Sequence, residues 1–181
     1  MKGSRLTVYA FGLAVLAALA VSAAADDTAT LRFTVDVAED FSRFVYTPVV
    51  PGDIPQRGST FVTDGNLFPR GTIEGDGASF DPNAAGSIGK WYCRGIHLVS
   101  APEIPGAPLW VDTAQLFQFP DDKRSLSSDG LEGSVPVLRA VIGGTGSLKD
   151  YVGHQQQEFL GFNASGGVNL RVTFVLRKAA R

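Results

Sequence analysis

VLRAVIGGTG, residues 137–146, is followed by two further apolar segments, 155–162 and 168–176, and this part of the chain decides the fold. Its three glycines, at 143, 144 and 146, permit backbone angles with positive φ, so a tight reversal is expected there. A second reversal is expected at NASGG, residues 163–167. The pattern predicts a three-stranded antiparallel meander.

The rest of the chain also reads as short strands joined by turns. LRFTVDV, residues 31–37, alternates apolar and polar residues with the period of two that is typical of a half-buried strand. Further strands are expected over 41–50, 59–67, 88–99 and 109–119, with a short one over 72–74. Irregular or exposed loops are expected over 51–57, 101–108 and 120–133 because these are rich in Pro, Gly or charge. No uninterrupted amphipathic helix of ten or more residues is found, so the fold class is all-β.

Seven or eight strands without a helical crossover predict an antiparallel sheet that closes as a barrel or folds as a sandwich. Closure is favoured because it removes edge strands, which promote aggregation. An eight-stranded barrel has an interior just wide enough to be filled by side chains or to hold one small ligand.

The first 25 residues are expected to be a signal peptide. Lys2 and Arg5 precede an apolar run from Leu6 to Val21, and SAAA, residues 22–25, offers the small residues that signal peptidase needs. The run is shorter than the roughly 20 residues that usually span a membrane. We expect cleavage near Ala25, a mature domain over 26–181, and a secreted location, extracellular or periplasmic, without membrane attachment.

Composition excludes several classes of function. The net charge of -2 favours neither a nucleic-acid partner nor an anionic membrane surface. Cys93 is the single cysteine, so no disulfide forms within the chain and cysteine zinc ligation is excluded. With two histidines there is no histidine cluster, and we expect neither a metal nor an organic cofactor.

The strand around Cys93 carries one set of candidate ligand contacts. Alternation places Trp91, Cys93, Gly95 and His97 on one face. An aromatic wall, a thiol, an imidazole and the space left by a glycine suit a ligand cavity. The more frequent alternative is structural: Cys93 as a small buried hydrophobe and His97 as a satisfied or solvent-facing residue.

Acids and amides on the strands supply candidates for proton transfer, among them Asp36, Asp64 and Asn66. A carboxylate inside an apolar barrel has a raised pKa, which fits it to exchange a proton near neutral pH. Most strand carboxylates instead point into water.

Four other features have simpler readings. The glycine run at 143–146 lacks the Lys-Ser/Thr of a phosphate-binding loop and leads into a strand. Arg139 fits a clamp for a carboxylate or enolate, whereas Arg171 is expected to face outward. The polar run at 155–158 suggests a wet face or a subunit contact. The sequon Asn163-Ala164-Ser165 fits a local hydrogen-bonding role in a turn.

RAVIGGTG, residues 139–146, together with the Gln/Glu-rich strand and LGFN, residues 160–163, resembles the allene oxide cyclase-like and dirigent-like barrel family. In that family such a run precedes the hairpin that closes an eight-stranded antiparallel, calycin-type barrel. The resemblance covers residues 139–176 and, more loosely, 61–119. Within that family the chain most resembles a secreted bacterial member.

The resemblance implies a hydrophobic barrel that holds a reactive intermediate and steers its cyclisation or isomerisation without a cofactor. FVTDGNLF, residues 61–68, is similar to a lumen-lining region of the family, so Asp64 is the first choice of proton donor or acceptor, with Asp36 as a second. Trp91, Cys93, His97 and Asn66 are the implied ligand contacts. The first strand offers Thr34 and Asp36 in place of the glutamate of the plant cyclases. Members often form dimers or trimers, so a homodimer or homotrimer is expected.

The sequence therefore predicts a barrel that binds a hydrophobic small molecule and acts as a cyclase or isomerase. Two alternatives are a non-catalytic carrier of lipocalin type and a structural barrel whose lumen is filled. A cavity in the lumen would exclude the filled structural barrel. A buried carboxyl with a raised pKa in that cavity would favour the enzyme over the carrier.

Overall fold

The computed structural model describes residues 30–51, 56–99, 110–120, 123–133 and 135–179, which form nine strands and two short 3-10 helices. The strands are β1 (Leu31–Glu39), β2 (Val45–Thr47), β3 (Thr60–Pro69), β4 (Gly89–His97), β5 (Val111–Gln118), β6 (Ser125–Glu132), β7 (Val137–Thr145), β8 (Tyr151–Phe162) and β9 (Val168–Lys178), and the helices are η1 (Phe41–Arg43) and η2 (Gly146–Leu148). Within this part of the chain no helix has the length and apolarity needed to cross a membrane. The predicted signal peptide over 1–25 and the Pro-rich loop over 101–108 lie outside it.

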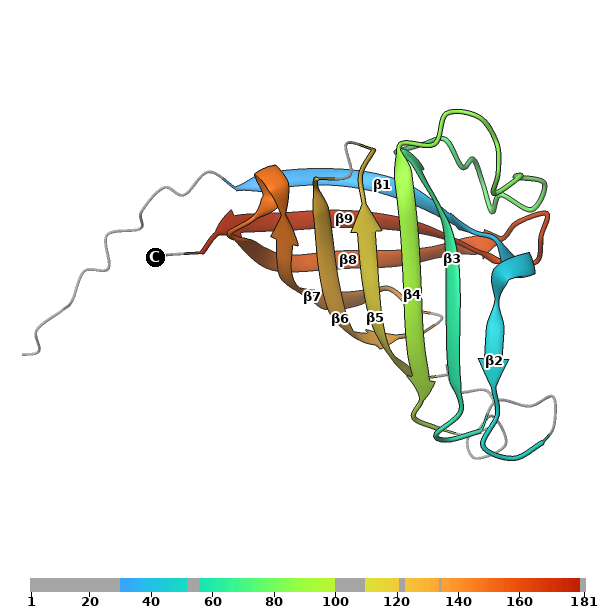
Figure 1. Cartoon of the computed structure of the whole chain (residues 1–181). Coiled ribbons are helices and arrows are strands. Elements are labelled where there is room, and N and C mark those ends of the chain that lie inside the picture. The colour runs from blue at the N-terminus through green and yellow to red at the C-terminus, as the bar shows by residue number, and fades with distance from the viewer. Residues whose placement is uncertain (1–29, 52–55, 100–109, 121–122, 134, 180–181) are drawn as a thin grey trace, which may run out of the picture.

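Eight of the described strands close into an antiparallel barrel, which confirms the predicted fold class (Figure 1). From β3 to β9 each strand pairs with the next along the chain, β9 pairs with β1, and β1 pairs with β3. At this closing seam Val35 lies opposite Pro69 and Glu39 opposite Gly65. β2 adds to the first residues of β3, on the edge that β1 leaves free. Closure pairs the edges that an open sheet would expose.

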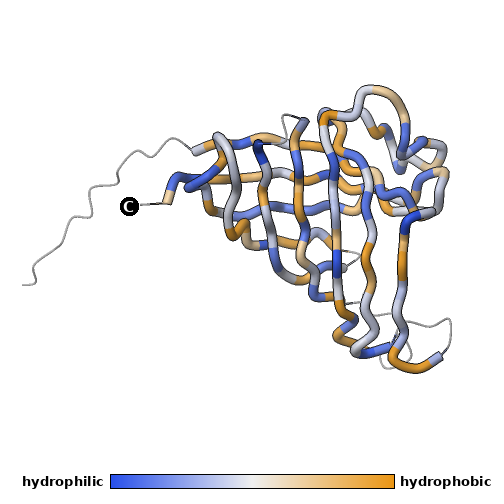
Figure 2. Tube along the Cα trace, in the orientation of Figure 1, coloured by the Kyte–Doolittle hydropathy of each residue, from blue (hydrophilic) through white to orange (hydrophobic). Residues whose placement is uncertain are grey.

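Hydrophobic and hydrophilic residues alternate along several of the strands (Figure 2), as expected where one face of a strand lines the lumen and the other lies on the outer surface. On β4, Trp91, Cys93 and His97 are buried, whereas Tyr92 and Ile96 on the opposite face are exposed. This is the division of β4 that the period of two predicts.

Aromatic and aliphatic side chains fill the end of the barrel where β1 begins and β9 ends. The ring of Phe174 lies 4.9 Å from that of Phe33 and 4.9 Å from that of Phe117. Leu126 and Leu176 are buried in the same cluster. Truncating such a core phenylalanine to alanine costs about 3–5 kcal/mol, so this end anchors the fold.

The long loop between β3 and β4 covers the outside of the barrel, where Ile73 packs on Ala38 and Phe68 in a second, smaller core. The carboxylate of Asp36 fixes the loop by accepting hydrogen bonds from the N–H groups of Gly71 (2.8 Å) and Ile73 (3.1 Å). The short strand expected over 72–74 is therefore wrong, because these backbone groups bind a side chain instead of a neighbouring strand.

Two other expected segments differ from the structure. The strand expected over 41–50 is η1 followed by the three-residue β2, because Asp40 caps the helix by accepting a hydrogen bond from the N–H of Ser42. The loop expected over 120–133 contains β6, whose register shifts between Ser127 and Ser128. The polar composition of residues 120–133 indicates a loop, but β6 is polar because part of the barrel interior that it lines is itself polar.

In the glycine run over residues 143–146 the chain reverses later than predicted. Gly143 and Gly144 lie within β7, and the reversal begins at Gly146, where φ is +59°. A Cβ at Gly146 would lie 1.9 Å from the carbonyl oxygen of Lys123, so this position needs glycine for its backbone angle and for space.

Candidate functional site: the open end of the barrel

A cavity of about 600 Å³ occupies the end of the lumen where β1, β4, β6 and β8 finish. Most of its wall is aromatic or aliphatic, and its polar side-chain groups are two carboxyls, a thiol, an imidazole, a hydroxyl, an amide and an indole N–H. The lining comprises Glu39, Phe44, Phe61, Thr63, Trp91, Cys93, His97, Val111, Glu132, Gly133, Gln157, Phe159, Phe162, Val168 and Leu170. A mainly apolar cavity with a few convergent polar groups is the usual form of a small-molecule site.

Glu39, the last residue of β1, is a buried carboxyl in this wall. Its Oε1 accepts a hydrogen bond from the hydroxyl of Thr63 (2.6 Å) and its Oε2 accepts one from the N–H of Val168 (2.8 Å). Burial raises the pKa of Glu39 above its ordinary value, and these two hydrogen bonds oppose the rise only in part. The carboxyl is thus suited to hold and release a proton within the cavity.

The second carboxyl, Glu132, belongs to a layer of hydrogen-bonded side chains that forms the floor of the cavity. Its Oε1 accepts hydrogen bonds from the amides of Gln115 (2.8 Å) and Gln157, and the Sγ of Cys93 lies 3.9 Å from its Oε2. The amide of Gln155 continues the layer by donating to Gln115 (2.8 Å). The layer holds the Glu132 carboxylate in one place.

Arg139 is buried next to this layer and does not line the cavity. Its guanidinium donates to the carbonyls of Gly130 (2.7 Å), Leu131 (3.0 Å) and Thr113 (2.7 Å). Burial lowers the pKa of Arg139, and the charge of Glu132 acts in the opposite direction. Because both Nη groups of Arg139 donate to backbone carbonyls, Arg139 does not form the carboxylate clamp that the sequence allowed.

Trp91 and His97 both line the cavity, and each has a buried nitrogen without a partner among the described residues: Nε1 of Trp91 and Nδ1 of His97. Burial lowers the pKa of His97, so its imidazole is neutral near pH 7. Cys93 also lines the cavity, and burial, followed by the charge of Glu132, raises the pKa of its thiol well above the usual range. The space expected at Gly95 is filled by the Phe61 ring, 2.6 Å from where a Cβ would lie.

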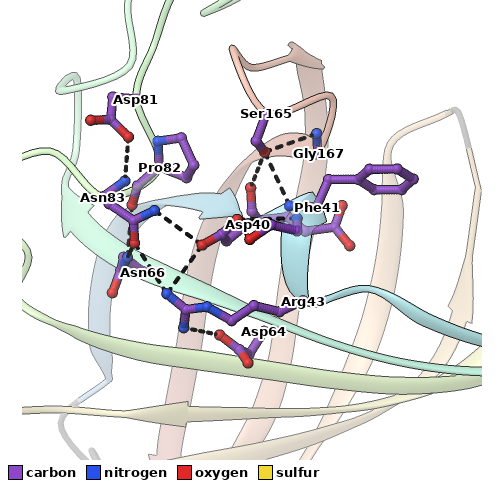
Figure 3. A network of polar contacts seen from close by, with 12 residues as sticks. Asp40, Phe41, Arg43, Asp64, Asn66, Asp81, Pro82, Asn83, Ser165 and Gly167 are labelled. Atoms are coloured by element: carbon purple, nitrogen blue, oxygen red, sulfur yellow. Dashed lines mark hydrogen bonds and ion pairs between the residues drawn. The ribbon is translucent and has the colours of Figure 1, made fainter.

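Asp64 and Asn66 lie outside the lumen, contrary to expectation, in a polar network between η1, β3 and the β3–β4 loop (Figure 3). Asp64 accepts a 2.6 Å hydrogen bond from Arg43, to which it is ion-paired. The amide of Asn66 donates to the carbonyl of Pro82 (2.7 Å) and accepts from Lys90 (2.6 Å). Their neighbour Thr63 faces the cavity, so alternation directs both side chains outward.

Asp36 also faces outward and is fully buried beneath the β3–β4 loop. Its carboxylate accepts hydrogen bonds from Nε (2.9 Å) and Nη2 (3.1 Å) of Arg171, which raise the pKa of Arg171. Asp36 therefore fixes the outer layer and has no access to the lumen.

Sequence reasoning missed the two carboxyls of the cavity. The expectation that the first strand offers Thr34 and Asp36 in place of a glutamate is wrong. β1 continues to Glu39, which lies on the same, lumen-facing side of the strand as Val35 and Val37. The unbroken alternation from residue 31 to 39 was the available signal. Glu132 was missed because its segment was read as a loop.

The polar run on β8 is explained by the same layer. Gln155 and Gln157 are buried in the lumen, whereas Gln156 and Glu158 alternate with them on the exposed outer face. The sequon is structural, as predicted: the buried amide of Asn163 donates to the carbonyl of Glu39 (2.9 Å) and its Oδ1 accepts from the N–H of Ser165 (2.9 Å). Across the described residues no group of three or more His, Cys, Asp or Glu is placed to hold a metal ion.

Solved structures with the same fold include proteins of several activities. A pterocarpan synthase dirigent protein has a TM-score of 0.62 at 14% identity, covering 84% of this chain and 97% of its own. Pyocyanin demethylase has a TM-score of 0.53 at 14% identity, covering 78% and 98%. A nonspecific heme-binding cyclase that catalyses a 4 + 2 cycloaddition during neoabyssomicin biosynthesis has a TM-score of 0.50 at 17% identity, covering 84% and 66%.

Neither a protein-family model nor a curated protein sequence matches the chain. At these identities the structural likeness establishes the fold. The chain has the dirigent-type barrel fold, as its resemblance to the allene oxide cyclase-like and dirigent-like family predicts.

Proposed function

We propose that the barrel binds a hydrophobic small molecule in its lumen and steers the cyclisation or isomerisation of that molecule without a cofactor, with Glu39 as proton donor or acceptor. The observation that carries the proposal is a buried carboxyl of raised pKa in the wall of a largely apolar cavity of about 600 Å³. Cavities of this size enclose most of the surface of a compact organic ligand.

The cavity contributes to such a reaction in two ways. Its wall holds a flexible substrate in one conformer. This lowers the activation barrier by several kcal/mol, because the substrate loses its conformational entropy on binding and not in the reaction step. Glu39 supplies general acid–base catalysis, typically a factor of about 10²–10⁴. Because an isomerisation leaves the composition of the substrate unchanged, a proton that Glu39 donates at one position returns to it from another before release.

The structural neighbours support this class of function. Their barrels serve a pterocarpan synthase dirigent protein, a demethylase and a cyclase. Each of these proteins processes an organic molecule, and the cavity found here gives this chain the space to do the same.

A non-catalytic carrier of lipocalin type is the second candidate, since a carrier needs the same cavity. A carrier has no use for a proton donor, so the raised pKa of Glu39 favours the enzyme. The third candidate, a barrel with a filled lumen, is wrong because the filled part ends below the cavity.

We also propose that the chain is exported and cleaved near Ala25, and that it assembles as a homodimer or homotrimer. The charged start, apolar run and small residues of the first 25 positions support export. N-terminal sequencing of protein produced by its host tests the cleavage, and sedimentation analysis tests the assembly.

The proposed function is tested in two steps. Native mass spectrometry of protein from its host should reveal a co-purifying small molecule, and that ligand is then incubated with the protein and two variants. Glu39→Gln should abolish conversion while binding persists, whereas Asp64→Asn should convert at the rate of the unaltered protein because Asp64 lies outside the lumen. Full conversion by Glu39→Gln, or none by the unaltered protein, would identify a carrier or a different catalytic group.

A further inference from the structure

We propose that the cavity selects its ligand by charge, binding a hydrophobic molecule with a protonated amine most tightly, a neutral one less tightly, and rejecting carboxylates. This inference rests on the proposed function, because it names the class of molecule that the same lumen accepts. It follows from the charges that face the cavity.

Two carboxyl groups, those of Glu39 and Glu132, line the cavity, and the described lining contains no Lys or Arg. The imidazole of His97 is neutral and the Cys93 thiol stays protonated near pH 7. Arg139, which does not line the cavity, offsets part of the negative charge of Glu132, but its hydrogen bonds go to three backbone carbonyls. A bound ligand therefore meets carboxyls directly and no cation.

This arrangement penalises an anion. Moving a carboxylate from water into an apolar cavity costs several kcal/mol unless a cation or several donors receive it. Here the nearest ionisable groups are the carboxyls of Glu39 and Glu132, and each repels an anion whenever it is ionised. Protonating Glu39 removes one of these charges but supplies no cation.

The same arrangement stabilises a cation. An ammonium group loses its hydration on entry, but it gains attraction from Glu132, whose carboxylate is held in place by Gln115 and Gln157. The cavity lining is also rich in aromatic side chains, among them Phe44, Phe61 and Trp91, and aromatic rings attract a positive charge.

Neutral polar groups also have partners in the cavity. The indole N–H of Trp91 lacks an acceptor among the described residues, and a hydroxyl or carbonyl on the ligand supplies one. This is why we place neutral molecules between amines and acids.

A matched series of probes tests the order. 2-Naphthylmethylamine, 2-naphthylmethanol and 2-naphthoate share one ring system and differ in charge at pH 7. Isothermal titration calorimetry should give an amine that binds about tenfold or more tightly than the acid, with the alcohol between them. Glu132→Gln keeps an acceptor for both glutamines and should reduce this ratio, and Glu39→Gln should reduce it further.

Glu158→Gln is the matched control, because Glu158 adjoins Gln157 on β8 but is exposed on the outer face. It should leave the ratio of amine to acid affinity unchanged. An acid that binds as tightly as the amine, or a ratio that survives loss of both cavity carboxyls, overturns charge selection while ligand binding stands. If none of the three probes binds, the ligand-binding function fails as well.

Discussion

The hydroxyl of Thr63 donates a 2.6 Å hydrogen bond to Glu39 across the seam where β3 and β1 close the barrel. This bond favours the ionised carboxyl, whereas burial favours the neutral one. The proton affinity of Glu39 is thus set by the closure of the barrel itself, because closure both buries the carboxyl and delivers its donor.

Replacing Thr63 by valine should raise the pKa of Glu39 further, since it removes a donor to the charged form and keeps the shape of the side chain. Carbon-13 NMR titration of the Glu39 carboxyl measures the change, with Glu39→Gln to assign the signal. Thr60→Val, at an exposed position of the same strand, should leave the titration unchanged. A lowered pKa in Thr63→Val would show that the hydrogen bond does not stabilise the carboxylate.

The raised pKa of Glu39 predicts a specific dependence of stability on pH. A carboxyl whose folded pKa lies above the unfolded value of 4.5 contributes stability that is fully present below that value. The contribution is lost as the pH rises through the raised folded pKa, because the folded state then holds a buried charge. Glu39→Gln does not titrate, so its stability relative to the unaltered protein should increase across this window.

Denaturation by urea at a series of pH values from about 4 to about 8 measures this difference. Glu158→Gln, whose side chain is exposed on β8, serves as the control and should follow the unaltered protein. Parallel pH profiles for Glu39→Gln and the unaltered protein would contradict the shift.

Asp36 and Arg171 form a second relationship that can be tested, on the outside of the barrel. Asp36→Asn should lower the free energy of unfolding by about 3 kcal/mol, because it removes the charge from a buried ion pair and leaves Arg171 without its partner. Ligand binding by the folded variant should persist, since the side chain has no access to the cavity. Asp112→Asn, at an exposed site on β5, should change stability by less than about 0.5 kcal/mol.

Much of the barrel was predictable because its strands obey the period of two. The alternation of residues 31–37 predicted a half-buried strand, that of 91–97 assigned the correct faces to β4, and the expected meander is β7, β8 and β9. Prediction failed where the lumen is polar. Ser128 and Glu132 on β6 gave that strand the composition of an exposed loop, although Ser128 is buried and Glu132 lines the cavity.

The proton-transfer candidates were misplaced for a related reason. The face on which a strand carboxylate lies follows from its neighbours in the strand. The similarity of residues 61–68 to a family segment favours Asp64, but Thr63 beside it is the residue that reaches the lumen. Asp36 differs, because it is fully buried in an outer layer that a loop creates. Burial of that kind depends on the path of residues 70–88, which no periodicity encodes.

Cys93 provides a direct probe of the cavity, because it is the single cysteine of the chain and lines the lumen. Burial and the charge of Glu132 raise the pKa of its thiol, so the reactive thiolate is scarce. The folded protein should therefore react with a disulfide reagent about tenfold or more slowly than the unfolded protein near pH 8. A bound amine probe should slow the reaction further by occupying the space next to the thiol.

Ile96→Cys in a Cys93→Ala background is the matched control, since it places a thiol on the exposed outer face of the same strand. This outer thiol should react with the reagent at the rate of an unfolded chain. The amine probe should not change that rate, because the barrel wall separates the thiol from the lumen. Equal rates for the two thiols would mean that the cavity is freely hydrated at Cys93. In that case desolvation would not raise the pKa of the nearby Glu39 carboxyl, and the acid–base role assigned to Glu39 would lose its physical basis.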